Sequence, residues 1–526
     1  MPNSVLILGA GINGTALARE LALNGVGVVV VDRQDIAAGA TSYSSRLIHG
    51  GLRYLEYGDF ALVRESLGER TRLLKLAPQF VRPLRLFIPV RNRFGGLLEA
   101  ARRFLGLKDR PHPNRVLHRG LWTVRFGLWL YDHYARDPTL PRHQSHQLEA
   151  ADAVPIDRIK YRWICSFSDA QIVYPERFTL ALLADAREIA AQQQTEFRVL
   201  TYHESELVGT VVKIRRVGQS DVVDQFEPSV IVNATGAWVD ETLKSLQVPS
   251  KRLMGGTKGS HFVTSHPRLS QLLAGRAVYT EAGDSRPIFI LPFVHGTLVG
   301  TTDEPFDGDP ATAVATSCEL EYLVAAVNEV FPDLHLTTAD IDVHYAGVRP
   351  LPYSDASTPG AVSRRHWMEP SPGGAVPLYS IIGGKLTTCR SLAEESAAEI
   401  LRHLGLARRA NSEDRPITER FPILSAVEHH DISVSTPTLD GTGIPIETVR
   451  QIICDQWVAR LDDLVERRLM LLYQPNLTSR CLDQLADLLI EAGLLTANER
   501  QTAIDAVIAR LATHFGKRVH ECRTPL

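Results

Sequence analysis

The stretch "SVLILGAGINGTALARELALNGVGVVVVD", residues 4–32, decides the fold of this chain. It begins with a short apolar run at 5–8, of the kind found in strands that are buried on both faces. An amphipathic segment suited to a helix lies between this run and a second apolar run at 28–31, which ends at Asp32. Between the first run and the helical segment stand three glycines in G-x-G-x-x-G spacing: Gly9, Gly11 and Gly14. The order predicts a strand, a tight turn, a helix and a second strand.

Each part of this pattern has a physical reason in a dinucleotide-binding site. The first glycine permits the tight turn, the second lets the backbone approach a pyrophosphate, and the third lets the helix pack closely against the strand. The N-terminus of the helix presents free N–H groups and a positive dipole to the phosphates. Asp32 lies 18 residues beyond Gly14, where a carboxylate accepts hydrogen bonds from a ribose hydroxyl. We therefore predict dinucleotide binding, and the acid favours FAD or NAD over NADP.

Two later stretches favour FAD. The stretch "VIVNATGAWVD" (230–240) is an apolar run that leads into Ala-Thr-Gly, ending at Gly236, and such a sequence closes a strand beside the cofactor in FAD enzymes of the glutathione-reductase-like type. The stretch "LYSIIGGKLTTCR" (378–390) is an apolar run that leads through Gly383 and Gly384 into a helical pattern. It places a second helix N-terminus where a flavin pyrimidine oxygen would lie.

The predicted fold class is α/β. Because the cofactor site draws on both ends of residues 1–405, we expect these residues to form one folded unit with inserted segments. The C-terminal part, 406–526, begins with a polar connector and continues with amphipathic patterns, so we expect a separate helical domain there. The remaining ranges divide into a Rossmann-like, glutathione-reductase-like FAD-binding domain (about 1–90, 150–250 and 340–405) and an interleaved antiparallel-sheet substrate domain (about 90–150 and 250–340).

Composition limits the classes of protein that this chain can belong to. The 526 residues are 44% hydrophobic and carry a formal net charge of −3, which argues against a general nucleic-acid binder. The 6 cysteines are scattered without a C-x-x-C pair, so we expect no metal site, no disulfide framework and a reducing compartment such as the cytoplasm. No apolar run reaches the roughly 18 residues of a membrane-spanning helix, and a buried strand that begins by residue 4 argues against a signal peptide.

The second strand leads into "SSRLIHGGLRYLE", residues 44–56, a mixture that neither a hydrophobic core nor a solvated loop requires. The pair Gly50-Gly51 lets the backbone approach a flavin ring, and Arg53 and Tyr54 would project over its face. Hydroxyl groups suited to the ribityl chain and the pyrophosphate come from Thr41, Ser42, Ser44 and Ser45.

This stretch resembles a signature of the FAD-dependent glycerol-3-phosphate dehydrogenase family, S-S-x-L-I-H-G-G-L-R-Y-L-E. Other motifs similar to that family follow in order over nearly the whole chain: "KGSH" (258–261), "GTTDEPFDGDP" (300–310), "YAGVRPL" (345–351), "GGKLTTCR" (383–390) and, more weakly, "CDQWVARLDDLVERR" (454–468). The resemblance implies oxidation of sn-glycerol 3-phosphate to dihydroxyacetone phosphate, by hydride transfer to flavin N5, with electrons passed to a quinone. We expect FAD to be non-covalent, since the glycine turn and the helix dipole are the only tether that the sequence shows.

The resemblance also implies how the substrate is held. A phosphate dianion needs charge-assisted, preferably forked donors, and Arg53 and Arg364 match family positions that look like phosphate-binding groups. Arg349 matches a position near the reacting end of the substrate, and Tyr54 can donate to the phosphate or to the substrate hydroxyl. An arginine can equally be a surface ion-pair partner, and Arg365 competes with its neighbour for the phosphate role.

The predicted catalytic groups are His261, Arg349 and Lys385. His261 is the candidate base, because a histidine side chain has an ordinary pKa of about 6.5 and can accept a proton near neutral pH. The alternative is that its ring only hydrogen-bonds the backbone. Lys385 matches a family lysine near the flavin, where a cation stabilises the reduced ring. The predicted cofactor-binding residues are Gly9, Gly11, Gly14, Asp32, Thr41, Ser42, Ser45, His49 (through its backbone), Gly50, Gly236, Gly383, Gly384, Lys385 and Leu386.

The chain departs from the family pattern at two places. Where many members have D-D-A-R-L, this chain has Tyr174-Pro175-Glu176 before Arg177, so paired acids are lost near the substrate domain. The last tyrosine of G-G-K-L-T-T-Y-R is Cys389 here, which removes a hydroxyl near the flavin site. Both changes put the substrate specificity in doubt.

Residues 91–130 have the composition of a helix that lies on a membrane surface. Nine lysines and arginines stand between Arg91 and Arg125 against two acids, and aromatic residues follow at Trp122, Phe126 and Trp129. Leu97, Leu98, Ala101, Phe104 and Leu105 can share one helical face, with Arg102 and Arg103 off it. We expect peripheral attachment to the inner face of the cell membrane, where a quinone is dissolved. The alternative is a pair of substrate-domain helices whose arginines line the entrance for an anionic substrate.

Two other functions remain open from the sequence. One is a soluble glycerol-3-phosphate oxidase that passes electrons to oxygen, which these motifs do not distinguish from a quinone-linked enzyme. The other is a redox-silent flavoprotein that binds a phosphorylated ligand, which the joint presence of Arg53, Arg349 and Lys385 opposes. Formation of a homodimer also remains open.

Overall fold

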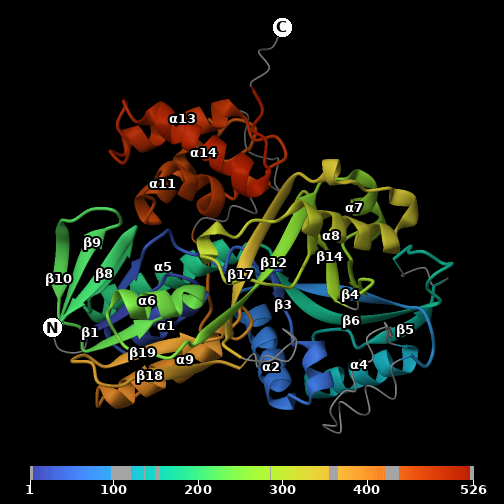
Figure 1. The fold of residues 1–526 in the computed structure, drawn as a ribbon, viewed down its shortest axis with the longest axis horizontal. Helices are drawn as coiled ribbons and strands as arrows, with labels where there is room; N and C mark the ends of the chain where they lie inside the picture. The colour runs from blue at the N-terminus through green and yellow to red at the C-terminus, as the bar shows by residue number, and fades with distance from the viewer. Residues whose placement is uncertain are drawn as a thin grey trace.

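The computed structural model describes residues 4–95, 120–135, 137–148, 154–284, 286–354, 365–418, 420 and 437–521. Within these ranges the chain forms a six-stranded sheet, a ten-stranded sheet and a small three-stranded sheet. The two large sheets lie side by side, and the C-terminal helices lie above them (Figure 1).

The six-stranded sheet is built on the stretch 4–32. Its strands, in spatial order, are β18 (Trp367–Ser371), β19 (Leu378–Ile382), β11 (Val230–Asn233), β1 (Ser4–Leu8), β2 (Gly27–Asp32) and β7 (Phe197–Thr201). All neighbours pair in parallel except β18, which runs antiparallel to β19. Strands β1 and β2 are buried almost throughout, as expected for parallel strands with both faces covered. Helices cover the sheet: α1 (Ile12–Leu23), α5 (Pro175–Gln193), α6 (Val239–Ser245) and α9 (Cys389–His403).

The ten-stranded sheet is mostly antiparallel. Its main path runs β16 (Glu304–Pro305), β12 (Met254–Thr264), β15 (Gly296–Gly300), β14 (Pro287–Phe293), β13 (Ala277–Glu281), β4 (Val81–Val90), β6 (Trp163–Ile172) and β3 (Leu47–Ile48). Two further strands complete it: β17 (Val343–Pro352) beside β12, and β5 (Gln144–Gln147) beside β6. Four helices pack on it: α7 (Pro267–Leu273) and α8 (Ser317–Val330) above, and α2 (Phe60–Leu76) and α4 (Leu121–Ala135) below (Figure 1).

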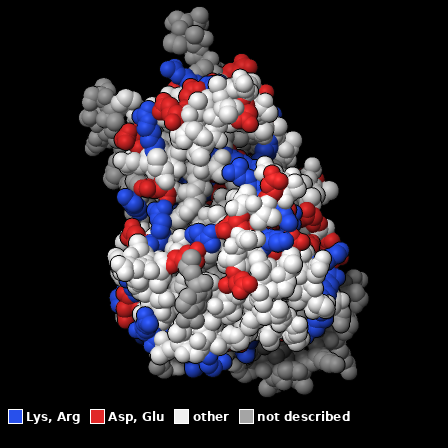
Figure 2. Space-filling view, turned by 90° about the vertical axis from the view of Figure 1, so that its left-hand side faces the viewer, with Lys and Arg blue, Asp and Glu red and all other residues white. Residues whose placement is uncertain are grey.

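The three-stranded sheet lies at the edge of the six-stranded sheet, where β8 follows β7. It consists of β8 (His203–Val208), β9 (Val211–Arg216) and β10 (Val222–Phe226), all antiparallel. Figure 2 shows the face on this side of the molecule, where basic and acidic side chains are interspersed rather than gathered by sign.

The α/β class with an antiparallel second sheet and C-terminal helices agrees with the sequence analysis, but the allocation of strands differs. Residues 81–90, 163–172 and 343–352 fall in ranges that the sequence analysis places with the FAD-binding domain, and the structure pairs them within the ten-stranded sheet. The apolar pattern of a strand shows that it is buried, but it does not specify which neighbouring strand it pairs with. The division of the chain into domains otherwise stays a proposal.

The C-terminal unit, residues 437–521, packs on both large sheets. Its elements are α11 (Ile446–Asp455), α12 (Leu461–Asp463), a π-helical turn (Leu464–Arg468), a 3₁₀ turn (Leu471–Tyr473), α13 (Ser479–Glu491) and α14 (Arg500–Phe515). Leu485 and Leu511 of this unit belong to the same hydrophobic core cluster as Phe293 and Tyr345 of the ten-stranded sheet. The unit is therefore continuous with the core of the substrate-side sheet.

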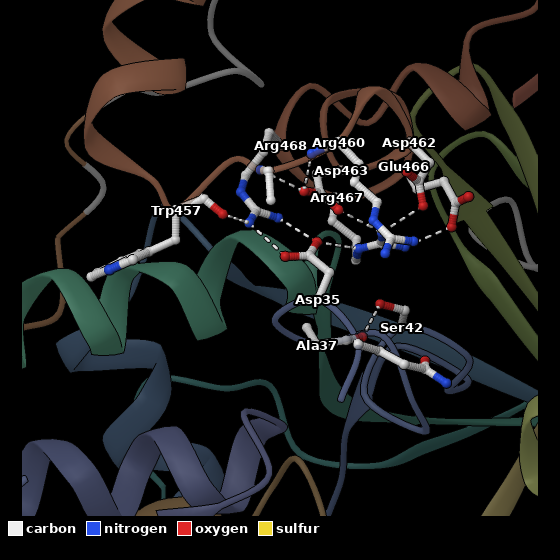
Figure 3. Close-up of polar contacts among 12 residues, drawn as sticks. Asp35, Ala37, Ser42, Trp457, Arg460, Asp462, Asp463, Glu466, Arg467 and Arg468 are labelled. Atoms are coloured by element: carbon white, nitrogen blue, oxygen red, sulfur yellow. Dashed lines mark hydrogen bonds and ion pairs between the residues drawn. The ribbon is translucent and has the colours of Figure 1, made fainter. Parts of the chain in front are cut away.

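Buried charges connect the C-terminal unit to the first βαβ segment (Figure 3). Asp35, which is 1% exposed, accepts hydrogen bonds from Arg467 at 2.5 Å and from Arg468 at 2.7 Å. The two arginines are consecutive residues of the π-helical turn, and Arg467 also contacts Glu466 and Asp463. Burial alone would raise the pKa of Asp35, but Arg468 and Arg467 outweigh it and hold the pKa at about 2.

We predict that Asp35→Asn lowers the free energy of unfolding by about 3–5 kcal/mol, because it removes the carboxylate that two buried guanidinium groups share. The contribution of this carboxylate is present at neutral pH and is lost as the pH falls from about 4 towards 2, since its folded pKa is depressed. Unfolding followed by circular dichroism measures both effects. Asp414→Asn is the control, because Asp414 is 86% exposed and pairs only with exposed Lys75; an equal loss from both variants would contradict the prediction.

Candidate active site

A cavity of about 1700 Å³ lies where the parallel strands of the six-stranded sheet end. Strands β1, β2, β11 and β19 point the same way, so their carboxyl ends meet at one edge, which is where ligands bind in sheets of this kind. The loops after all four strands line the cavity, and strands β12, β14 and β17 of the ten-stranded sheet contribute residues to it. One cavity therefore joins the dinucleotide-type turns to the second sheet.

The geometry of the first glycine turn fits a dinucleotide. Gly9 has a φ of +105°, and a Cβ on it would lie 2.7 Å from the carbonyl oxygen of Ala234 on the neighbouring strand. A Cβ on Gly14 would lie 2.0 Å from the carbonyl oxygen of Gly9, so helix and turn touch there. The first turn of α1 thus faces the cavity at close range, and Thr41 accepts a hydrogen bond from the N–H of Ile12 at 3.1 Å. The N-terminus of a helix in this position can hold a pyrophosphate through its backbone N–H groups.

Asp32 ends β2 at the wall of this cavity. Its carboxylate accepts hydrogen bonds from the backbone N–H groups of Ala10 at 2.7 Å and Gln34 at 2.8 Å. Burial raises its pKa to about 6, despite these two bonds. The side chain therefore fixes the first turn, and binding of a ribose by the same carboxylate stays a prediction.

Most of the predicted site residues come together in the cavity. Those that line it are Gly9, Gly11, Asp32, Thr41, Ser45, His49, Tyr54, Gly236, His261, Arg349, Gly383, Gly384, Lys385 and Leu386. They come from positions up to 377 residues apart in the chain (386 − 9) and from both large sheets. Arg364 and the side chain of Arg53 lie outside what the structure describes.

Three predicted cofactor-binding residues do not line the cavity. Gly14 acts in helix packing, as described above, and the Ser42 hydroxyl donates to the carbonyl of Ala37 at 2.6 Å within its own loop. The N–H of Gly50 donates to the hydroxyl of Tyr131 at 2.8 Å. Gly50 therefore faces α4 rather than the cavity, and the next residue, Gly51, lines the cavity in its place. The sequence pattern does not distinguish the two glycines.

His261 lies on β12 and is 2% exposed. Its Nε2 is 2.9 Å from the hydroxyl oxygen of Ser45, and its ring stacks on Tyr345 with a centroid distance of 5.0 Å. Burial, and after it the positive charges of Arg349 and Arg46, lower the pKa of His261 well below 6.5. The imidazole is therefore neutral at physiological pH, which a proton acceptor requires.

Arg349 lies on β17, opposite Thr257 of the strand β12 that carries His261, and its fork is held in place. One nitrogen donates to Asp303 at 2.9 Å, and the other donates to Thr301 at 2.8 Å and to the carbonyl of Thr302 at 3.0 Å. These bonds fix the guanidinium against the cavity. On the other side of the cavity, the Lys385 ammonium lies 4.4 Å from the centroid of the Tyr54 ring, in a cation–π contact.

The structure accounts for both departures from the family pattern. Glu176 is buried and binds Arg46 with both oxygens, at 2.6 and 3.0 Å, so this acid supplies the countercharge for an arginine of the 44–56 stretch. Cys389 begins α9 inside the hydrophobic core beneath α1, away from the residues that line the cavity, and burial raises its pKa to about 12. A hydroxyl at position 389 would meet that core.

The sequence analysis did not identify Arg46, Glu176 or Asp169. Asp169 lines the cavity and accepts from Tyr131 at 2.6 Å and from Arg70 at 3.0 Å, which holds the backbone around Gly50. A signal for the first pair was present, because a buried-type stretch containing Arg46 needs an acid elsewhere. Nothing in the sequence alone says which of the acids it is.

Comparison with known proteins agrees with this site. A family model described as FAD dependent oxidoreductase matches residues 4–390. A glycerol-3-phosphate dehydrogenase from Synechocystis sp. is 33% identical over 520 residues, which cover 95% of this chain and 86% of that protein. The chain belongs to the FAD-dependent glycerol-3-phosphate dehydrogenase family.

Two further proteins are similar to this chain. A D-erythritol 1-phosphate dehydrogenase from Brucella abortus is 33% identical over 394 residues, covering 74% of this chain and 72% of that protein. The crystal structure of a Bacillus halodurans glycerol-3-phosphate dehydrogenase complexed with FAD is similar with a TM-score of 0.67 at 19% identity, covering 97% and 95% of the two chains. The enzyme is thus an FAD-dependent oxidoreductase, and the fold likeness extends through the C-terminal unit.

The sequence alone predicts an inflection near the ordinary pKa of histidine if His261 is the base, and the buried environment shifts that expectation. We predict that flavin reduction by substrate keeps its rate as the pH is lowered through about 6.5, and falls only at more acid pH, where a histidine of depressed pKa finally takes up a proton. Anaerobic stopped-flow absorbance measures this. His261→Asn should slow the reduction and remove the acid limb; an inflection at or above about 6.5 in the wild type would contradict the assignment.

Proposed function

We propose that this enzyme oxidises sn-glycerol 3-phosphate to dihydroxyacetone phosphate. The observation that carries the proposal is a neutral His261 and a fixed Arg349 on adjacent strands, both facing the cavity that the dinucleotide-type turns form. A bound FAD would supply the acceptor for the hydride of the carbon that bears the substrate hydroxyl. His261 takes the hydroxyl proton, and Arg349 orients the reacting oxygen. The glycine turns, the N-terminus of α1 and the turn that precedes α9 would hold the cofactor without a covalent bond, with His49 contributing through its backbone.

The phosphate dianion is assigned to Arg53 and Arg364 on the family resemblance, and Tyr54 and Lys385 line the cavity. The competitor Arg365 is committed elsewhere, because its guanidinium donates to Asp59 at 2.7 Å. This contact favours Arg364 as the phosphate ligand of the pair. D-Erythritol 1-phosphate is the second candidate substrate. The relative named D-erythritol 1-phosphate dehydrogenase is 33% identical to this chain, as is the Synechocystis relative, and both compounds are phosphomonoesters of a polyol.

We predict that glycerol 3-phosphate bleaches the flavin anaerobically and that glycerol does not, because the dianion supplies most of the binding. Arg364→Ala should weaken capture of the phosphorylated substrate by about 2–5 kcal/mol, as when one partner of a buried charge pair is removed. Arg365→Ala is the matched control and should have little effect. A flavin that glycerol 3-phosphate leaves oxidised would refute the function, and bleaching by erythritol 1-phosphate alone would move the assignment to the second candidate.

We further propose that electrons leave to a quinone and that the enzyme attaches to the inner face of the cell membrane. The support is an aromatic stripe on α4, in which Trp122, Phe126 and Trp129 are 47%, 56% and 54% exposed, with Arg125 beside Trp122. Exposed aromatic rings of this kind occupy the headgroup level of a bilayer. Residues 96–119, with the predicted apolar face at 97–105 and Arg102 and Arg103, lie outside the described part. Within the described part, every helix is too short or too polar to span a bilayer.

We predict that replacing Trp122, Phe126 and Trp129 together with serine reduces binding to anionic liposomes by about tenfold or more and lowers quinone-coupled turnover, because the apolar anchor is lost. Anaerobic reduction of the flavin by substrate should be unchanged. The control replaces Val222 and Val223 of β10, which are exposed to a similar degree on another surface. Liposome sedimentation provides the measurement, and equal binding by both variants would exclude the stripe. Reoxidation by air as fast as by a quinone analogue would instead favour an oxidase.

A further inference from the structure

The C-terminal unit contacts the loop that carries part of the active site. Residues 33–46 connect β2 to β3, and most of them line the cavity. Three side chains of this loop bind the C-terminal unit. Asp35 binds Arg467 and Arg468, and the hydroxyl of Tyr43 accepts from Arg510 at 3.4 Å. The third is Arg46, which lies next to Ser45 in the sequence.

Arg46 is 0% exposed and is surrounded by acceptors. Its guanidinium donates to both oxygens of Glu176, to the carbonyls of Val173 at 2.7 Å and Ser42 at 3.1 Å, and to the hydroxyl of Tyr473 at 2.6 Å. Tyr473 belongs to the 3₁₀ turn of the C-terminal unit, and its ring also lies 4.9 Å from the guanidinium carbon. A planar fork that is satisfied on so many sides can adopt one position only.

The backbone at Arg46 needs this fixation. Its φ is +55°, in the left-handed region that costs a residue with a side chain on the order of 1 kcal/mol or more. Its carbonyl accepts from the N–H of Ile172 on β6 at 2.9 Å, which ties the strained residue to the ten-stranded sheet. The side-chain contacts therefore hold a backbone conformation that sets the direction of Ser45.

Two contacts lead from Arg46 to the catalytic histidine. The Ser45 hydroxyl lies within hydrogen-bond distance of Nε2 of His261, and the tautomer of the ring decides which of the two donates. Tyr345 contacts both Arg46 and the imidazole: its ring stacks on His261, its centroid is 5.9 Å from the guanidinium carbon of Arg46, and its hydroxyl donates to the carbonyl of Ser44 at 2.9 Å.

We propose that Arg46 is a positioning residue for His261, and that Tyr473 of the C-terminal unit holds Arg46 in the position that this role requires. The proposal rests on the assignment of His261 as the base in the proposed function. It gives the C-terminal unit a part in the reaction, although it contributes no residue that touches the reacting atoms.

Few charged groups of the described residues act on the imidazole of His261. Within the described residues, the charged groups that act on His261 are Arg349 from β17 and Arg46 from the loop, with Glu176 behind Arg46. Tyr345 is the ionisable neighbour that stacks on the imidazole, and burial raises the pKa of that tyrosine to about 12, so it stays neutral. Burial is the largest cause of the low pKa of His261, followed by Arg349 and then Arg46, so a displacement of Arg46 would raise that pKa only in part.

The test compares Tyr473→Phe with Tyr202→Phe in the holoenzyme. Tyr473→Phe keeps the ring and loses the hydroxyl on Arg46. Tyr202→Phe loses a hydroxyl on Asp463, at the same interface of the C-terminal unit but away from Arg46. We expect Tyr473→Phe to lower the limiting rate of flavin reduction by about tenfold, with the substrate dissociation constant within about twofold, and to move the acid limb to higher pH. Tyr202→Phe should leave all three unchanged at a similar loss of melting temperature.

A second measurement does not depend on turnover. The ring ¹⁵N resonances of His261, assigned with His261→Asn, report its tautomer and its titration. We expect a single tautomer and no titration near the ordinary histidine pKa of about 6.5 in the wild type and in Tyr202→Phe, and a mixture with titration at higher pH in Tyr473→Phe. Arg46→Lys, which keeps the charge and loses the fork, should reduce the rate with a smaller shift of the acid limb.

The outcomes separate the two proposals. If glycerol 3-phosphate and erythritol 1-phosphate both fail to reduce the wild-type flavin, the proposed function is wrong, and the ¹⁵N spectra still decide whether Arg46 positions His261. If the rate and the spectra of Tyr473→Phe match those of Tyr202→Phe, the C-terminal unit acts only as a support for the fold, and the positioning role is refuted.

Discussion

A buried arginine without a carboxylate would cost several kcal/mol, and much of this structure is arranged so that Arg46 has one. Glu176 comes from the first turn of α5, Val173 from the end of β6, Tyr473 from the C-terminal unit and Ser42 from the loop itself. Four parts of the chain therefore meet at one guanidinium. Because all of these contacts must form together, the loop beside the cavity, the helix behind it and the C-terminal unit adopt one relative arrangement.

The same arrangement explains why one cavity serves two tasks. The six-stranded sheet supplies turns and helix ends, which suit phosphates and a flavin but offer no fixed base. The ten-stranded sheet supplies His261 and Arg349 on adjacent strands, with Arg349 fixed by Asp303 and two threonines. Neither sheet alone contains both a cofactor grip and a proton acceptor. The loop with Ser45 and Arg46 runs from the first sheet to the second and keeps the two sets of groups in register.

Local features of the site could be predicted from the sequence, and long-range pairings could not. The turn at Gly9 and Gly11, the strand that ends at Asp32 and the lining at Gly383 and Gly384 follow from the backbone requirements of short stretches. Gly50 was assigned to the cavity in place of Gly51, because a glycine pair does not show which member turns inward. The partners of Arg46 and Asp35 are 130 and more than 430 residues away, and a single sequence does not connect them. Burial, which lowers the pKa of His261, also depends on strands whose pairing the apolar pattern leaves open.

The separation between Asp35 and its two arginines has a consequence during synthesis of the chain. Asp35 stands in the first cofactor loop, and Arg467 follows 432 residues later. At about 5–20 residues per second, a ribosome needs roughly 20–90 s to make that interval. During this time the carboxylate cannot be buried at low cost, so the loop has to stay hydrated and the cavity wall incomplete. The flavin turn is translated before the two arginines that support it from outside. The ion pairs that hold the outer side of this loop therefore form only after the C-terminal unit has been made.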